Sequence, residues 1–149
     1  MTIKIVSFSD LTKKELYKIL QLRAEVFIVE QNCVYQDIDD KDEKAMHLLA
    51  YKNNTIIAYT RLFKAHDYMD CASIGRVVVR KDYRKHGYGE ELMRASIQGI
   101  KDIFKETTIK VSAQLYLKKF YNDLGFVQLG ETYQEDGIPH ILMIRKEEE

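Results

Sequence analysis

The sequence predicts a mixed α/β fold: a mostly antiparallel sheet that contains one central parallel strand pair and carries helices on both faces. Two observations lead to this fold class. Segments with the apolar patterns of strands and of helices follow one another in the order β-α-β-β-β-α-β-α-β-β. A strand–helix–strand unit in the middle of this order implies a parallel pair, whereas hairpins on either side of it imply antiparallel neighbours.

The first part of the chain predicts a strand and a long helix. Residues 2–9 alternate apolar and polar side chains imperfectly, as a strand does. Thr12 and Glu15 have the spacing of a capping box, and apolar residues at helical spacing then predict a helix to about Val29. Residues 31–46 are polar and predict an irregular loop with room for one short helix.

Three strands are expected next, over residues 47–52, 55–64 and 73–80. Asn53 and Asn54 join the first two, since asparagine tolerates the left-handed backbone of a tight turn. The third contains the continuous apolar run Val77–Val79, which predicts a strand buried on both faces.

The second half predicts two helices and three strands. A helix over residues 87–104 has one inward stripe, formed by Leu92, Met93, Ser96, Ile97, Ile100 and Phe104. A β-branched strand over residues 107–113 and a helix over residues 115–124, which Gly125 ends, follow it. Strands over residues 126–133 and 139–146 are joined by the turn Glu135-Asp136-Gly137.

The composition predicts one globular domain that spans residues 1–149. The chain is 46% hydrophobic and 31% charged, which provides enough apolar surface for its own core. No apolar run approaches the roughly 20 residues of a membrane helix, and the N-terminus lacks the pattern of a signal peptide. Cys33 and Cys71 are too few for a disulfide framework, so we expect a reduced, cytoplasmic protein.

The charges exclude several kinds of partner. The 23 Lys and Arg residues balance the 23 Asp and Glu residues, so the basic excess of a nucleic-acid-binding or membrane-surface protein is missing. The histidines and cysteines show no metal-ligand spacing, and we expect no metal. Locally, residues 37–43 are acidic and would weakly attract a cationic ligand, whereas residues 80–86 are basic.

The basic segment leads from a buried strand into a helix and contains Gly87 and Gly89. Free backbone amides at a helix N-terminus form an anion site, and Arg84 and Lys85 add charge to it. This pattern predicts a pyrophosphate-binding turn, although an ordinary strand–helix turn would have similar residues. A P-loop and a dinucleotide fingerprint are both excluded, because their full glycine and lysine patterns are absent.

Together with a second segment, this turn resembles the GCN5-related N-acetyltransferase (GNAT) superfamily. The signature [Arg/Gln]-x-x-Gly-x-[Gly/Ala] is matched by residues 84–89, Arg84-Lys85-His86-Gly87-Tyr88-Gly89. A second signature, an Asn seven residues before a Tyr and then a Gly-Phe pair, is matched by Tyr121, Gly125 and Phe126, with Gln114 in place of the Asn. The predicted strand order also fits, so the resemblance covers nearly the whole chain.

A closer resemblance is to the ElaA-like subgroup of this superfamily. Residues 22–33, 35–39, 74–79 and 135–140 look like segments of that subgroup, in which Gln114 is the expected residue. This resemblance defines the expected fold more closely, but it says little about the acceptor substrate.

The resemblance implies that acetyl-CoA binds where the strands over residues 74–79 and 109–113 splay apart. Backbone groups of the first strand pair with the pantetheine amides, and amides of the turn hold the pyrophosphate. The implied cofactor-binding residues are Val77, Val78, Val79, Arg84, Lys85, His86, Gly87, Tyr88, Gly89 and Gln114.

The resemblance further implies direct transfer of the acetyl group to a primary amine of a small molecule or protein. It is also compatible with a homodimer. Tyr121 is implied as the general acid for the departing thiolate. A general base must deprotonate the amine, and Glu30 and His140 are the leading candidates, with Glu135, Asp37 and His47 as others. Arg23 lies on an otherwise apolar helix face and predicts a buried ion pair with Glu25, Glu30 or an acid in the following loop.

Two further functions compete with an acetyltransferase. A non-catalytic module that binds or senses acyl-CoA would need the turn but not Tyr121. A nucleotide-phosphate protein would need a magnesium-binding Lys-Ser/Thr pair, which the turn lacks.

Overall fold

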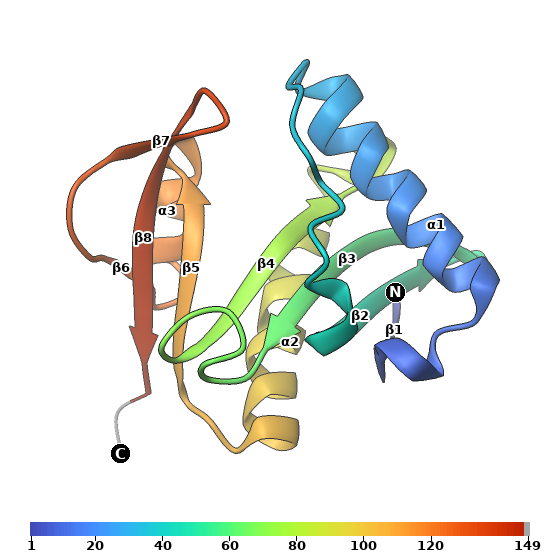
Figure 1. The fold of residues 1–149 in the computed structure, drawn as a ribbon, viewed down its shortest axis with the longest axis horizontal. Coiled ribbons are helices and arrows are strands. Elements are labelled where there is room, and N and C mark those ends of the chain that lie inside the picture. Colours follow the sequence, from blue (N-terminus) through green and yellow to red (C-terminus); the bar gives the residue numbers. More distant parts are fainter. Residues whose placement is uncertain (148–149) are drawn as a thin grey trace.

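Eight strands form one sheet in the computed structural model, which describes residues 1–147 (Figure 1). The order across the sheet is β1-β2-β3-β4-β5-β8-β6, and β7 pairs with β8 outside this path. Only β4 and β5 are parallel, which confirms the predicted fold class. The strands are β1 (Thr2–Ser7), β2 (Met46–Lys52), β3 (Thr55–Phe63), β4 (Ala72–Val79), β5 (Thr108–Gln114), β6 (Val127–Gln128), β7 (Tyr133–Glu135) and β8 (Ile138–Lys146).

Helices cover both faces of this sheet, as predicted. The helix α1 (Lys13–Arg23) continues as a π-helical segment (Ala24–Glu30), where the sequence predicts ordinary helix to about Val29. It packs on the face that carries Leu49, whereas α2 (Tyr88–Phe104) packs on the face that carries Leu48. The short helix α3 (Lys118–Asn122) follows β5 and lies on the same side as α2 (Figure 1). None of the helices within residues 1–147 has the length and hydropathy to cross a bilayer.

The start of α1 is fixed by a capping box. The Glu15 amide donates to Oγ1 of Thr12 at 3.0 Å, and the Thr12 amide donates to Oε1 of Glu15 at 2.9 Å. Two orphan amides of the first turn are thereby satisfied, as the spacing of these residues predicts.

The parallel pair is brief, and the two strands then diverge. Only Ala72 with Ile109 and Ser73 with Lys110 are paired between β4 and β5. Beyond these pairs β4 runs on to Val79 and β5 to Gln114, and the two ends separate (Figure 1). The facing edges of both strands therefore lack a strand partner in this part of the sheet.

A bulge interrupts β4 in the divergent part. Tyr59 of β3 pairs with Val78, and Arg61 pairs with Gly75, so the single residue Thr60 opposes two residues of β4. One of those two is Arg76, whose φ of 49° lies in the left-handed region.

Two sequence predictions require correction. Val78 is buried, but Val77 and Val79 are only half-buried, because β4 loses its partner on one edge where β5 diverges. The strand predicted over residues 126–133 is instead the two short strands β6 and β7. Gly130, with φ of 85°, lies between them and breaks the extended chain. The predicted turn at Asp136 and Gly137 between β7 and β8 is confirmed.

Candidate active site

A cleft of about 990 Å³ opens where β4 and β5 diverge. Its walls come from β4, the turn before α2, α3, the β7–β8 hairpin and the segment after α1. Twelve of the thirteen predicted site residues line it: Glu30, Val77, Val78, Val79, Arg84, Lys85, Gly87, Tyr88, Gly89, Gln114, Tyr121 and His140. The exception is His86, which is exposed and has its ring centroid 5.9 Å from that of Tyr88.

One end of the cleft is the N-terminus of α2. The helix begins at Tyr88, and its N-cap is Gly87, which has φ of 80° and no side chain to accept from the first amides. An added Cβ at Gly87 would meet no atom within 4 Å, so glycine is needed there for its backbone conformation rather than for space. Unpaired amides and the positive end of the helix dipole make this turn suited to an anion.

The guanidinium of Arg84 is directed away from the turn. Its Nε donates to the carbonyl oxygen of Val79 at 2.9 Å, and its Nη2 donates to Oε1 of Glu30 at 2.9 Å. The hydrogen bond from Arg84 lowers the pKa of Glu30 below its ordinary value. Glu30 is therefore held as a carboxylate whose charge offsets that of Arg84, and Lys85 is exposed.

Tyr121 lies on α3 and lines the cleft, although it is only 4% exposed. Its ring meets those of Phe120 and Phe126 edge-on, with centroids 5.1 and 5.8 Å away. Burial raises the pKa of the Tyr121 phenol well above its ordinary value, so the hydroxyl carries its proton at neutral pH. The side chain thus has the protonation state that a proton donor needs.

His140 and Glu135, two of the candidate bases, lie together on the β7–β8 hairpin. Nδ1 of His140 is 2.7 Å from the carbonyl oxygen of Ile138, which can only accept, so Nδ1 carries a proton. Nε2 is therefore the atom that gains a second proton, and it lies 3.2 Å from Oε2 of Glu135.

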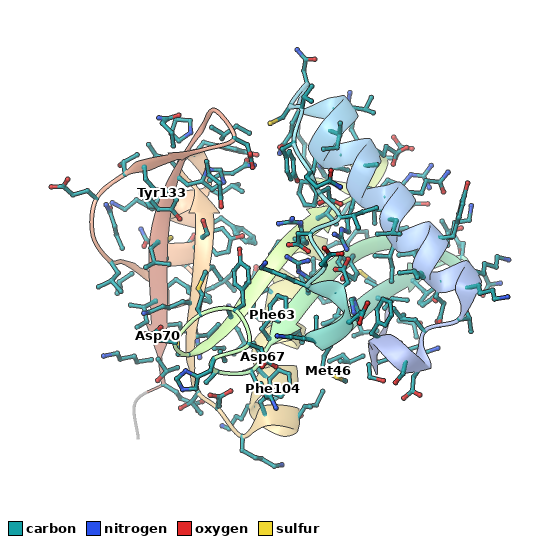
Figure 2. All side chains as sticks on the ribbon, viewed as in Figure 1. Met46, Phe63, Asp67, Asp70, Phe104 and Tyr133 are labelled. Atoms are coloured by element: carbon teal, nitrogen blue, oxygen red, sulfur yellow. The ribbon has the colours of Figure 1, made fainter. Side chains whose placement is uncertain are left out.

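Ser112 and Tyr133 complete this group. Ser112 Oγ donates to Oε2 of Glu135 at 3.2 Å and also hydrogen-bonds the Tyr133 hydroxyl. Tyr133, which Figure 2 labels beside β8, stacks on the imidazole of His140 with 6.1 Å between centroids. The imidazole is therefore held by the carbonyl oxygen of Ile138, the carboxylate of Glu135 and the ring of Tyr133.

The two remaining candidate bases do not line the cleft. His47 is buried, where Nε2 bonds the carbonyl oxygen of Asp42 at 2.8 Å and Nδ1 bonds the Tyr59 hydroxyl. Burial lowers the pKa of His47. Asp37 accepts hydrogen bonds from two arginines, so neither group is free to take a proton from a substrate.

The acidic loop after α1 is neutralised by buried arginines. Nε of Arg23 donates to Asp37 at 3.0 Å, and its Nη1 donates to Asp42 at 2.8 Å. The predicted buried ion pair of Arg23 with an acid of the following loop is therefore confirmed. Arg61 forms two hydrogen bonds to Asp39, at 2.8 and 2.9 Å. Three of the loop's carboxylates therefore already have cationic partners, which lessens the attraction to a cationic ligand that the sequence predicts.

Several residues of the cleft were not predicted. Arg76, Tyr35 and Tyr68 line it. Arg76 and Tyr35 lie in segments that resemble the ElaA-like subgroup, but no role in the site was predicted for them. Ser112 could have been found, since it alternates with Gln114 along β5 and must share its face.

The fold and this cleft define an acyltransferase of the GNAT class. A family model for the acetyltransferase (GNAT) domain matches residues 9–147, so the chain belongs to that family. Among its relatives, the protein ElaA of Escherichia coli K12 is 41% identical over 140 residues, which cover 93% of this chain and 92% of ElaA. A UPF0039 protein of Schizosaccharomyces pombe is 42% identical over 138 residues, 91% of each chain.

Solved structures agree with this assignment. The crystal structure of an acyl-CoA N-acyltransferase from Pseudomonas aeruginosa has a TM-score of 0.91 at 40% identity, and the alignment covers 97% of this chain and 99% of that one. Escherichia coli ElaA has a TM-score of 0.91 at 38% identity, with the same coverage. The chain is thus an ElaA-like member of the GNAT family, as its sequence motifs predict.

Proposed function

We propose that the protein transfers the acetyl group of acetyl-CoA directly to a primary amine of its acceptor. The observation that carries this proposal is the arrangement of the cleft between the divergent ends of β4 and β5. An open helix N-terminus lies at one end of the cleft, and a protonated tyrosine and a histidine–carboxylate pair lie on its walls.

The donor would bind along β4 and the turn that follows it. The unpaired edge around Val77–Val79 would pair with the pantetheine amides, much as a neighbouring strand would. Amides from Arg84 to Gly89 would hold the pyrophosphate, with the Lys85 side chain beside it. Gln114, at the end of β5, faces the same space from the other strand.

In the chemical step the amine nitrogen attacks the thioester carbonyl carbon, and the carbon–sulfur bond breaks. The thiolate that leaves has a conjugate thiol pKa of about 8.5, so it is already a fair leaving group. Tyr121 would donate its proton to that sulfur, and the nitrogen of the new amide would release its extra proton to the tyrosinate, which restores Tyr121. The hydroxyl enters the reaction protonated, and its place on the cleft wall supports this role; its raised pKa makes it a weaker acid than an exposed tyrosine.

The amine must first lose a proton, since an alkylamine has a pKa of about 10.4. We assign this step to His140 rather than to Glu30. Nε2 of His140 is the nitrogen that carries no proton, and Oε2 of Glu135 lies 3.2 Å from it. Glu30 is the weaker base, because Arg84 lowers its pKa.

A non-catalytic module that binds or senses acyl-CoA is the alternative. Both functions use the turn before α2, but only an enzyme needs His140 and Tyr121 in one cleft. A cytoplasmic location belongs to the same proposal and is supported by the two free cysteines, Cys33 and Cys71.

The test is a screen of purified protein with acetyl-CoA and a panel of primary amines that includes polyamines, amino sugars and lysine peptides. We expect release of CoA thiol that requires an amine, together with an acetylated product in the mass spectrum. The same screen with longer acyl-CoA donors checks the preference for acetyl. Saturable binding of acetyl-CoA without release for any amine would favour the alternative.

A further inference from the structure

Arg76 holds an uncommon backbone conformation at the edge of the cleft. Its φ of 49° lies in the left-handed region, which a side chain with a Cβ adopts only at an energetic cost. Together with Val77 the residue forms the bulge in β4, where the edge of Val77–Val79 begins. Such strain persists where the surroundings enforce it, and it is concentrated at functional sites.

Asp37 holds Arg76 in this conformation. Nε of Arg76 donates to Oδ1 of Asp37 at 2.8 Å, and Nη2 donates to the carbonyl oxygen of the same residue at 3.0 Å. The guanidinium also lies 5.8 Å from the ring centroid of Tyr35. Two nitrogens of the Arg76 side chain are therefore held by Asp37 in the loop after α1, and Nη2 also lies 3.4 Å from Oδ2 of Asp39.

Asp37 itself is held from the opposite side. Its Oδ2 accepts from Nε of Arg23 at 3.0 Å, and its carbonyl oxygen accepts from Nη2 of Arg23 at 3.1 Å. Arg23 is fully buried on α1. Asp37 thus links the buried Arg23 of α1 to Arg76 in the β4 bulge. Its own side chain does not line the cleft.

We propose that Asp37 is a positioning residue for acyl transfer. Through Arg76 it holds the β4 bulge in the conformation that presents the unpaired edge of Val77–Val79 to the thioester donor. This inference rests on the proposed function, because it takes the donor arm to lie along that edge. A role in stability alone is the competing explanation, since a carboxylate between two arginines also stabilises the fold.

Asp42 provides a matched control for that explanation. Its Oδ1 accepts from the buried Arg23 at 2.8 Å and from the buried Arg61 at 3.0 Å, so it too bridges two arginines, but it makes no hydrogen bond to Arg76 within residues 1–147. Asp37→Asn and Asp42→Asn should both lower the melting temperature. Only Asp37→Asn should change the backbone conformation of β4 at the edge of Val77–Val79.

The experiment is calorimetric titration of the full chain with CoA, below the melting temperature of every variant. We expect about tenfold weaker binding for Asp37→Asn, and binding within about twofold of the unmodified protein for Asp42→Asn. Arg76→Gly should also weaken binding about tenfold. Glycine accepts positive φ without strain, so this second variant decides the question even if Asp37→Asn does not fold.

Unchanged CoA affinity in Arg76→Gly, or an equal loss of affinity in Asp37→Asn and Asp42→Asn, would overturn the positioning role. Failure of the unmodified protein to bind CoA would overturn the proposed function and this inference with it. The two failures are distinct, because the first occurs in a protein that still binds CoA.

Discussion

Arg84 and Glu30 form an ion pair that joins the turn before α2 to the end of the π-helical segment, with 2.9 Å between Nη2 and Oε1. One residue was predicted as a phosphate-binding cation and the other as a general base. Their pairing changes both expectations. The carboxylate is occupied and a weaker base, and the guanidinium contributes less net charge to the turn than its sequence position suggests.

The first prediction tests the turn itself. Gly87→Glu should weaken acetyl-CoA binding strongly, because the new carboxylate adds like charge where the pyrophosphate would lie. Gly130→Glu is a matched control: Gly130 also has positive φ and open space around it, and it lies away from the cleft. Calorimetry on both folded variants checks this, and equal affinity in the two would remove the phosphate-binding assignment.

The second prediction concerns charge at the turn. Binding of acetyl-CoA should weaken as salt rises, because exposed charges such as that of Lys85 are screened over roughly 8 to 10 Å at physiological ionic strength. Glu30→Gln removes the negative partner of Arg84, so it should tighten binding and steepen the salt dependence. Titrations at low and physiological ionic strength measure both effects. If the affinity for acetyl-CoA does not change with salt in either the unmodified protein or Glu30→Gln, backbone amides alone hold the donor.

The third prediction distinguishes the two leading bases. His140→Asn can keep the hydrogen bond to the carbonyl oxygen of Ile138, but it lacks the Nε2 that takes up a proton. Turnover should fall by about 10² or more, within the usual range for general base catalysis, with unchanged affinity for acetyl-CoA. Glu30→Gln should keep turnover within a few-fold. Steady-state kinetics with an acceptor from the amine screen measure both variants. A larger loss of turnover in Glu30→Gln than in His140→Asn would contradict the assignment.

The fourth prediction concerns stability in acid. A hydrogen bond from Lys4, with others from the Thr12 amide and Tyr51, lowers the pKa of Glu15 from 4.5 to about 2. Because the folded pKa lies below the unfolded value, ionised Glu15 stabilises the fold above about pH 4.5. That contribution is lost as the pH falls from 4.5 through about 2.

Glu15→Gln should therefore show a shallower decline in the free energy of unfolding across this window than the unmodified protein. Denaturant titrations at several pH values in the window measure the two slopes. Identical slopes would mean that the interactions of Glu15 are equally strong in the unfolded chain.

The fold was largely predictable because its helices and strands follow local rules. The capping box at Thr12, the turn at Asn53 and the apolar stripe of α2 each depend on a few neighbouring residues. The segment after Phe126 was harder, since β6 and β7 are short and lie at the edge of the sheet, where little apolar burial marks them. The bulge at Arg76 had no local signal, because tertiary contacts to Asp37 enforce it.

The candidate site was predictable where it is local and not where it depends on side-chain partners. The turn around Gly87 is a contiguous motif, and the structure brings it together with Tyr121 at one cleft. The pairing of Glu30 with Arg84 joins residues that are 54 positions apart. The neutralisation of the acidic loop likewise depends on Arg61 and Arg76 from distant strands. Charge patterns along the chain could not show which acids remain free.

The measurement that tests the account most directly is amine-dependent release of CoA by Tyr121→Phe. Loss of the hydroxyl removes the proposed proton donor, while the ring keeps its packing against Phe120 and Phe126. Tyr116→Phe is the control, because Tyr116 also lines the cleft but is 75% exposed. The account predicts that Tyr121→Phe loses about 10²-fold in turnover, binds acetyl-CoA normally and stays folded, with Tyr116→Phe nearly unaffected. Turnover of Tyr121→Phe within about twofold of the unmodified protein would contradict it.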